Sequence, residues 1–134
     1  MKIEKMAPIS VDAFHYDKNS EEVTPHQQVN FGLRQVIKEN QDGTKDEGEA
    51  GNFFELRIIY EVAPAAVPFT VSGSISQVVQ LIGYQGDGSD LKPADYQMLS
   101  RPLVEMLESL IYETTQLTLK EPVNLQFKAN FANR

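Results

Sequence analysis

Cysteine is absent from the 134 residues of this chain. Without thiols the chain can form neither disulfides nor thiolate metal sites, and a reducing compartment is compatible with the sequence. Long apolar runs are absent as well, since no stretch approaches the roughly 18 residues that a membrane span requires. The opening MKIEKMAPIS also lacks the apolar centre of a signal peptide. We therefore expect a soluble, cytoplasmic protein with no membrane partner.

Basic residues are in the minority. The 12 Lys and Arg residues are outnumbered by 19 Asp and Glu residues, which sets the formal net charge at −7. This balance repels a phosphate backbone, so nucleic acid is not an expected partner. A chain of this length can bury roughly two thirds of its unfolded surface in one core. We therefore expect residues 1–134 to form a single domain.

No catalytic serine motif occurs. Ser72, Ser74 and Ser76 flank Gly73 in regular alternation, whereas a serine nucleophile usually occupies a strained turn between a strand and a helix. A polar strand face is the better interpretation of this stretch. Glycine inside a strand usually marks a bulge or a close approach by another backbone, and Gly73 is expected to do so.

Metal and phosphate motifs are missing too. His15 and His26 belong to no clustered ligand set, so no metal site is predicted. The glycines of GYQGDG, residues 83–88, follow neither the dinucleotide-binding nor the P-loop spacing, and Asp87 would oppose a phosphate. The sequence therefore predicts no catalytic residue and no cofactor, and hence no enzyme.

Four segments show the alternation of apolar and polar residues that is typical of strands, at residues 9–16, 29–37, 53–62 and 69–84. Breaks of the hairpin type separate them, one containing the Asp42-Gly43 dipeptide of a tight turn. Strands that follow one another with short breaks predict an antiparallel meander.

Beyond residue 90 the apolar period changes to about 3.6. Pro93 suits the first position of a short helix that ends near Leu99, and Ser100 can cap a second, amphipathic helix. In the tail, residues 121–134, spacings typical of a strand and of a helix both occur, and the helix is favoured. The apolar stripe of the second helix consists of Leu103, Met106, Leu107, Leu110, Ile111 and Thr114.

These patterns predict an α+β fold of two layers, in which a four-stranded, antiparallel, meander-like sheet carries two C-terminal helices on one face. This order resembles SecB, the export chaperone. FTVSGSISQVVQLIGYQG resembles its last long strand, SRPLVEMLESLIYETT its main helix, and TQLTLKEPVNLQF the segment that enters its final helix. VDAFHYD and LSRPLVEMLE are similar to a bacterial family of unknown function that is related in fold to SecB.

The resemblance extends over about residues 9–131. It implies a SecB-like homo-oligomer, a dimer or a tetramer, that presents apolar grooves to unfolded polypeptides. Adjacent Phe53 and Phe54 must point to opposite faces of their strand, and an aromatic side chain on an uncovered face needs a partner surface or a ligand. The candidate polypeptide contacts are Phe53, Phe54, Tyr60, Leu125, Phe127 and Phe131.

The small side chains of the fourth strand would let another element approach closely, which suits a contact between subunits. Its candidate residues are Ser72, Gly73, Ser74 and Ser76. We therefore predict a non-enzymatic, chaperone-like binding protein. The alternative is a small-molecule-binding or regulatory domain that uses the loop at residues 83–90 and a pocket beside the helices.

Overall fold

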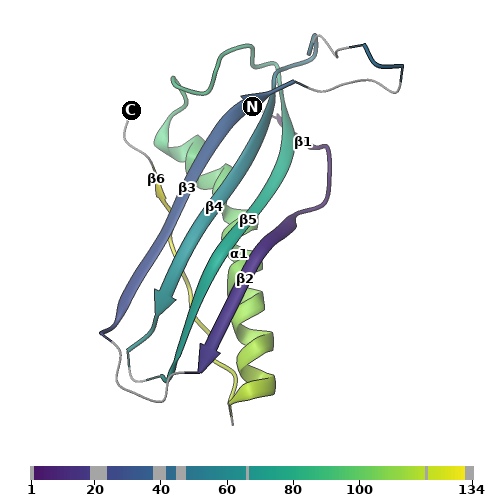
Figure 1. Cartoon of the computed structure of the whole chain (residues 1–134). Helices are drawn as coiled ribbons and strands as arrows, with labels where there is room; N and C mark the ends of the chain where they lie inside the picture. Colours follow the sequence, from purple (N-terminus) through teal and green to yellow (C-terminus); the bar gives the residue numbers. More distant parts are fainter. Residues whose placement is uncertain are drawn as a thin grey trace.

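The computed structural model describes residues 2–18, 24–37, 42–44, 48–65, 67–119 and 121–131. Within these ranges one sheet and one helix, α1 (Pro93–Thr118), are formed (Figure 1). The predicted Asp42-Gly43 turn lies between residues 38–41 and 45–47, which fall outside the described ranges. The strands are β1 (Lys2–Lys5), β2 (Ser10–Lys18), β3 (His26–Val36), β4 (Phe53–Ala63), β5 (Phe69–Ile82) and β6 (Asn130–Phe131).

The sheet differs from the predicted four-stranded antiparallel meander. Its strand order is β1-β5-β4-β3-β6, and β2 pairs with the same edge of β5 as β1 does. All pairs are antiparallel except β3 with β6, which is parallel. The predicted fold class is therefore wrong on two counts: the described sheet is mixed and six-stranded, and β2 crosses over to lie beside β5.

The two strands that the sequence pattern did not predict are short. Three of the four residues of β1 are charged, and β6 contains two residues. Neither segment has the run of β-branched and aromatic residues that predicts a strand. Charged side chains do suit the place of β1 at the rim of the sheet, because they discourage pairing with other chains.

The helical part also differs from the prediction, since one helix replaces the expected pair. Pro102 lies inside α1 and has no N–H for the helical hydrogen bond. The Ser100 hydroxyl donates to the carbonyl of Gln97 at 3.2 Å instead of capping a second helix. The helix continues because packing of one apolar face stabilises it more than propensity does. The buried residues on both sides of Pro102 are Leu99, Leu103, Leu107 and Ile111.

The tail is extended, so the favoured helix is wrong there as well. Residues 121–131 run alongside α1 and end in β6, next to β3 (Figure 1). Burial alternates along them, and an extended chain produces such alternation whereas a helix does not. The inward-facing residues, all buried or half-buried, are Val123, Leu125, Phe127, Ala129 and Phe131.

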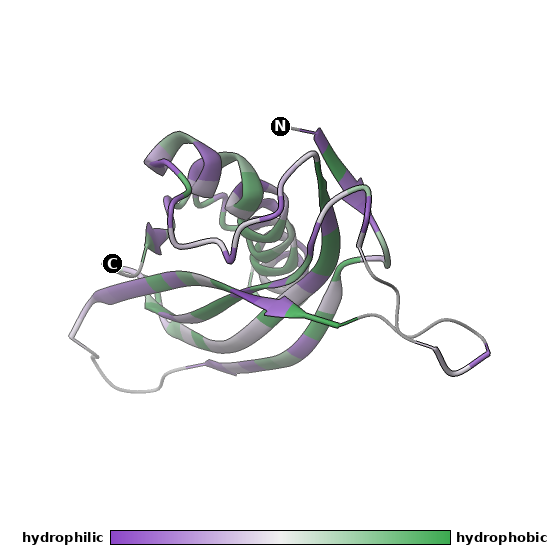
Figure 2. Cartoon of the chain, turned by 90° about the horizontal axis from the view of Figure 1, so that it is seen from above, coloured by the Kyte–Doolittle hydropathy of each residue, from purple (hydrophilic) through white to green (hydrophobic). Residues whose placement is uncertain are grey.

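The sheet curls around α1, which lies against its inner face (Figure 2). Burying each large apolar side chain there contributes about 1.5–3 kcal/mol, so this layer supplies most of the apolar stabilisation. The fully buried side chains of the sheet include Phe54, Leu56, Ile58, Phe69, Ile75 and Leu81. No helix among the described residues covers the opposite, outer face.

Two backbones approach each other closely at Gly73. A Cβ atom there would stand 2.0 Å from the carbonyl oxygen of Ala13 and 2.7 Å from the hydroxyl oxygen of Tyr60. The Tyr60 hydroxyl donates to the same Ala13 carbonyl at 2.9 Å. Next to this point the register of β2 shifts between Val11 and Ala13. Gly73 thus marks a close approach, as expected, and the approaching backbone belongs to the same chain.

Replacing Gly73 with alanine should lower the free energy of unfolding by about 2–4 kcal/mol, because the new methyl group collides with backbone and the φ of Gly73, 154°, is rare for other residues. Urea denaturation measures the change. Gly32→Ala is the matched control: a Cβ atom at Gly32 would have no neighbour within 4 Å, so the change should stay within about 1 kcal/mol. Equal losses in both variants would contradict this account.

Candidate binding face

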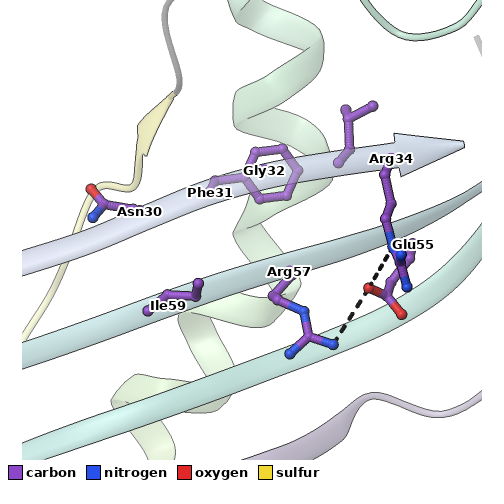
Figure 3. Close-up of a pocket in the computed structure, with 8 residues that line it drawn as sticks. Asn30, Phe31, Gly32, Arg34, Glu55, Arg57 and Ile59 are labelled. Atoms are coloured by element: carbon purple, nitrogen blue, oxygen red, sulfur yellow. Dashed lines mark hydrogen bonds and ion pairs between the residues drawn. The ribbon is translucent and has the colours of Figure 1, made fainter.

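The outer face is the surface of the sheet that is turned away from α1. Strand register places alternate residues of each long strand on it. In Figure 3 the helix lies behind the strands, and the side chains of Asn30, Arg57 and Ile59 project in front of them. The outer-face residues used below are Asp12, His15, Asn30, Arg34, Glu55, Arg57, Ile59, Glu61, Ser72, Ser74 and Ser76.

A hollow of about 570 Å³ lies over β3 and β4 on this face (Figure 3). Gly32 leaves room in its middle, and Ile59 and Arg34 stand on either side. Ile59 is 59% exposed, although it lies within a sheet strand. The hollow therefore combines an uncovered apolar side chain with charged groups.

A chain of ion pairs crosses the face from β3 to β2. The Nε atom of Arg34 lies 3.2 Å from Oε1 of Glu55, and Nη2 of Arg57 lies 3.4 Å from the same oxygen. On its other side, Nη1 of Arg57 lies 3.6 Å from Oδ2 of Asp12. The two guanidinium groups and two carboxylates balance each other, and each isolated surface pair contributes about 0–1 kcal/mol. Their main effect is to orient Arg57 beside Ile59.

Asp12 is held by hydroxyl groups as well. The Ser76 hydroxyl donates to its Oδ2 at 2.6 Å, and the Ser10 hydroxyl donates to its Oδ1 at 2.9 Å. These hydrogen bonds, that of Ser76 first, and the charge of Arg57 lower the pKa of Asp12 below 3.8, and they outweigh the opposing effect of desolvation. Asp12 therefore stays ionised over the whole physiological range.

A second hollow, of about 590 Å³, adjoins the first and shares Asn30, Arg57 and Ile59 with it. His15, Ser72 and Glu61 lie in one row across β2, β5 and β4 on its floor. Among the described residues no hydrogen bond joins His15 to Ser72, so the row lacks the contact that activates a serine nucleophile. Its polar groups suit binding rather than covalent chemistry.

Tyr60 closes the floor of the second hollow from the inner side. Burial raises the pKa of Tyr60 to about 12, which keeps its hydroxyl protonated as the donor to Ala13. This hydrogen bond crosses the sheet beside Gly73 and joins β4 to β2. The floor is therefore fixed, whereas the side chains around it stand in solvent.

The structure separates the six predicted polypeptide contacts. Phe54 and Tyr60 lie in the core beneath α1, Phe127 packs against the helix, and Phe53 is buried at the end of β4. The remaining two, Leu125 and Phe131, are half-buried on the tail. A role in polypeptide contact stays a prediction for all six, and the four buried side chains would need a rearrangement to become accessible.

The predicted subunit contacts lie in the middle of the sheet. β5 is bordered by β2 along one edge and by β4 along the other. Ser72, Ser74 and Ser76 therefore offer no free strand edge, and Gly73 is already approached by Ala13. A second subunit could reach these serines only through the outer face, and this contact remains a prediction.

The loop at residues 83–90 is filled by its own side chains. The Tyr84 hydroxyl contacts Asp90 and accepts the N–H of Gly88, and Asp87 accepts the N–H of Ser89 at 2.9 Å. The amides of Gly88 and Ser89 are thus occupied by side chains of the loop itself. Within the described ranges no cluster of three or more histidine and carboxylate ligands occurs, and no helix there combines the length and hydrophobicity of a membrane span.

Ile59, Arg57 and Asp12 are the residues of this face that the sequence prediction missed. Ile58 and Ile59 are adjacent in β4, so they must point to opposite faces. The same signal was recognised in Phe53-Phe54, and it would have placed Ile59 on the uncovered side. For Asp12 the sequence offers no such signal, because its partners Arg57 and Ser76 come from distant strands.

Replacing Ser76 with alanine should raise the pKa of Asp12 toward 3.8, because the strongest hydrogen bond to the carboxylate is lost. A carboxylate whose pKa is lowered in the folded protein stabilises the fold at pH values above the pKa of the unfolded chain. This contribution is lost as the pH falls through the pKa of the folded protein. The variant should therefore lose less stability on acidification. Carboxyl ¹³C shifts followed by NMR measure the pKa. Ser74→Ala is the control; a shift of equal size there would refute the assignment.

Comparison with solved structures finds the same fold elsewhere. A protein of unknown function from Streptococcus agalactiae aligns with a TM-score of 0.72 and 23% identity, over 95% of this chain and 98% of its own. A SecB-like chaperone of Mycobacterium tuberculosis, in complex with a ChAD peptide from the HigA1 antitoxin, aligns with a TM-score of 0.55 and 10% identity, over 93% of this chain and 90% of its own. At these identities the likeness shows the fold.

Among curated proteins none matches the sequence. A family model does match, over residues 1–127, and its description is "Protein of unknown function (DUF1149)". The predicted resemblance to a family of unknown function with a SecB-like fold is thereby confirmed. The chain belongs to the DUF1149 family.

Proposed function

We propose that this chain is a non-enzymatic binding protein that holds non-native polypeptide on the outer face of its sheet. The observation that carries the proposal is the position of Ile59. This side chain is 59% exposed, and it stands where two hollows of about 570 and 590 Å³ meet. A partner that lies across the two hollows would cover this apolar side chain and would meet polar groups on either side of it.

The polar groups around Ile59 fit an extended chain. Asn30 and Arg57 border both hollows, and a carboxamide and a guanidinium can bind the carbonyl groups of any polypeptide. Apolar side chains of the client would lie against Ile59. Contacts to main chain and to one apolar position give affinity with little sequence specificity, which suits a holdase.

The comparison with solved structures supports the same proposal. The SecB-like chaperone of similar fold was solved with a peptide bound to it. A homo-oligomer, a dimer or a tetramer, would bring several outer faces together and raise the effective concentration of binding sites. Light scattering of the purified protein measures its native mass, and a monomer at working concentration would count against an oligomeric holdase.

A small-molecule ligand is the second candidate, because a volume near 570 Å³ lies within the range of ligand pockets, about 300–1,000 Å³. A thermal shift screen with metabolites distinguishes the two functions. A specific small ligand raises the melting temperature through linkage, whereas a holdase responds to unfolded clients. A stabilising metabolite together with no effect on clients would replace the first proposal by the second.

Replacing Ile59 with serine should weaken the suppression of aggregation of heat-denatured citrate synthase, measured by light scattering. Loss of the apolar contact should lower client affinity by about fivefold. The substitution is at an exposed position, so the free energy of unfolding should change by no more than about 0.5 kcal/mol.

The matched control is Leu117→Ser, which removes another exposed apolar side chain, 86% exposed, from α1 instead of the outer face. It should suppress aggregation as the unchanged protein does. If the unchanged protein fails to suppress aggregation at several-fold molar excess, or if both variants lose activity equally, the outer face is not the binding surface.

A further inference from the structure

The tail resembles a bound peptide more than a packed element of the fold. Residues 121–131, here called the strap, are extended and pair with β3 at two positions, Asn30 with Asn130 and Phe31 with Phe131. The rest of the strap lies along α1 without regular backbone pairing (Figure 1). The main chain of this part of the strap is therefore bound by side chains and not by a neighbouring strand.

Side chains of α1 hold that main chain. The Thr115 hydroxyl accepts the N–H of Val123 at 2.7 Å, and Oε2 of Glu108 accepts the N–H of Phe127 at 2.8 Å. Nη1 of Arg101 donates to the carbonyl of Phe127 at 3.2 Å. All three contacts involve backbone atoms of the strap, so any extended segment could make them.

The side chains that bind the strap backbone are oriented by contacts within α1. Thr115 donates its hydroxyl hydrogen to the carbonyl of Ile111, one helical turn earlier, at 2.7 Å. Oε1 of Glu108 accepts from Nη2 of Arg101 at 2.7 Å, which leaves Oε2 aimed at the strap. The partners of the strap backbone are thus held by α1 itself, as in a preformed peptide site.

Alternate side chains of the strap enter the cleft between α1 and β3. Phe127 is buried, and the ring of Phe131 lies 6.0 Å from that of Phe31 and 5.5 Å from that of Tyr96. The fit is incomplete at Ala129. This small residue borders a hollow of about 170 Å³ between the strap and α1. A larger inward side chain could fill that space.

We propose that the cleft between α1 and β3 is a second binding site for extended polypeptide with apolar residues at alternate positions, and that the strap is its resident occupant. This site is separate from the outer face and goes beyond the proposed function. Because the strap is tethered, it competes at an effective concentration in the millimolar range. A free segment enters when the strap is weakened or when the segment fits better.

The test uses a fluorescein-labelled peptide with the sequence of residues 121–131, added to the full chain and followed by fluorescence anisotropy. Phe127→Ala weakens the tethered strap and leaves the cleft unchanged, so it should bind the peptide about tenfold or more tightly than the unchanged protein. Lys128→Ala alters an exposed strap residue and should bind like the unchanged protein. Equal binding to all three proteins would overturn the proposal.

Two further measurements keep the test decisive. A peptide with leucine at the position of Ala129 should bind the Phe127→Ala protein about threefold more tightly, since it fills the adjoining hollow. Adding Ile59→Ser both to the unchanged protein and to Phe127→Ala removes the apolar contact of the outer face, and the two proteins should still differ about tenfold in peptide affinity. Loss of this difference would assign the peptide to the outer face.

If Phe127→Ala unfolds the protein, the proposal is tested instead by hydrogen exchange of the unchanged chain. The amides of Val123 and Phe127 should exchange at least tenfold faster than those in the middle of β4 and β5, through local release of the strap. If the strap amides exchange only through global unfolding, the strap is an integral part of the core and the proposal fails.

Discussion

The apolar contact between α1 and the inner face of the sheet is the constraint on which the rest of the molecule depends. Leu103 and Leu107 lie in this contact and are fully buried, and the helix continues through Pro102 because of it. A single helix can cover one face. The other face must therefore remain compatible with water, and it does so through ion pairs and hydroxyl groups around Ile59. Among the described residues, the packing of α1 on the inner face thus also explains why the outer face is left exposed.

Local patterns predicted the four long strands near their observed ranges, because alternation of apolar and polar residues is a property of neighbouring positions. They could not predict which strands pair. β2 lies next to β5, and that choice depends on a crossover and on the space that Gly73 leaves for Ala13. The extended tail was missed for a similar reason, since its conformation is decided by contacts with α1 and not by its own spacing.

The candidate binding face was predictable in part. Two adjacent apolar residues in a strand indicate one side chain on each face, and Ile58-Ile59 carries this signal as clearly as Phe53-Phe54 does. The ion pair between Arg57 and Asp12 was not predictable. It depends on the register of β2 on β5 and on the register shift after Val11, which bring Asp12 beside Arg57. Ser76 and Asp12 are 64 positions apart in the sequence.

The order of the elements along the chain has a consequence for folding. β3 and α1, the walls of the cleft, are translated before the strap that fills it. The pairing of the strap with β3 therefore joins positions about 100 residues apart, and such distant contacts form late because the loop between them must close first.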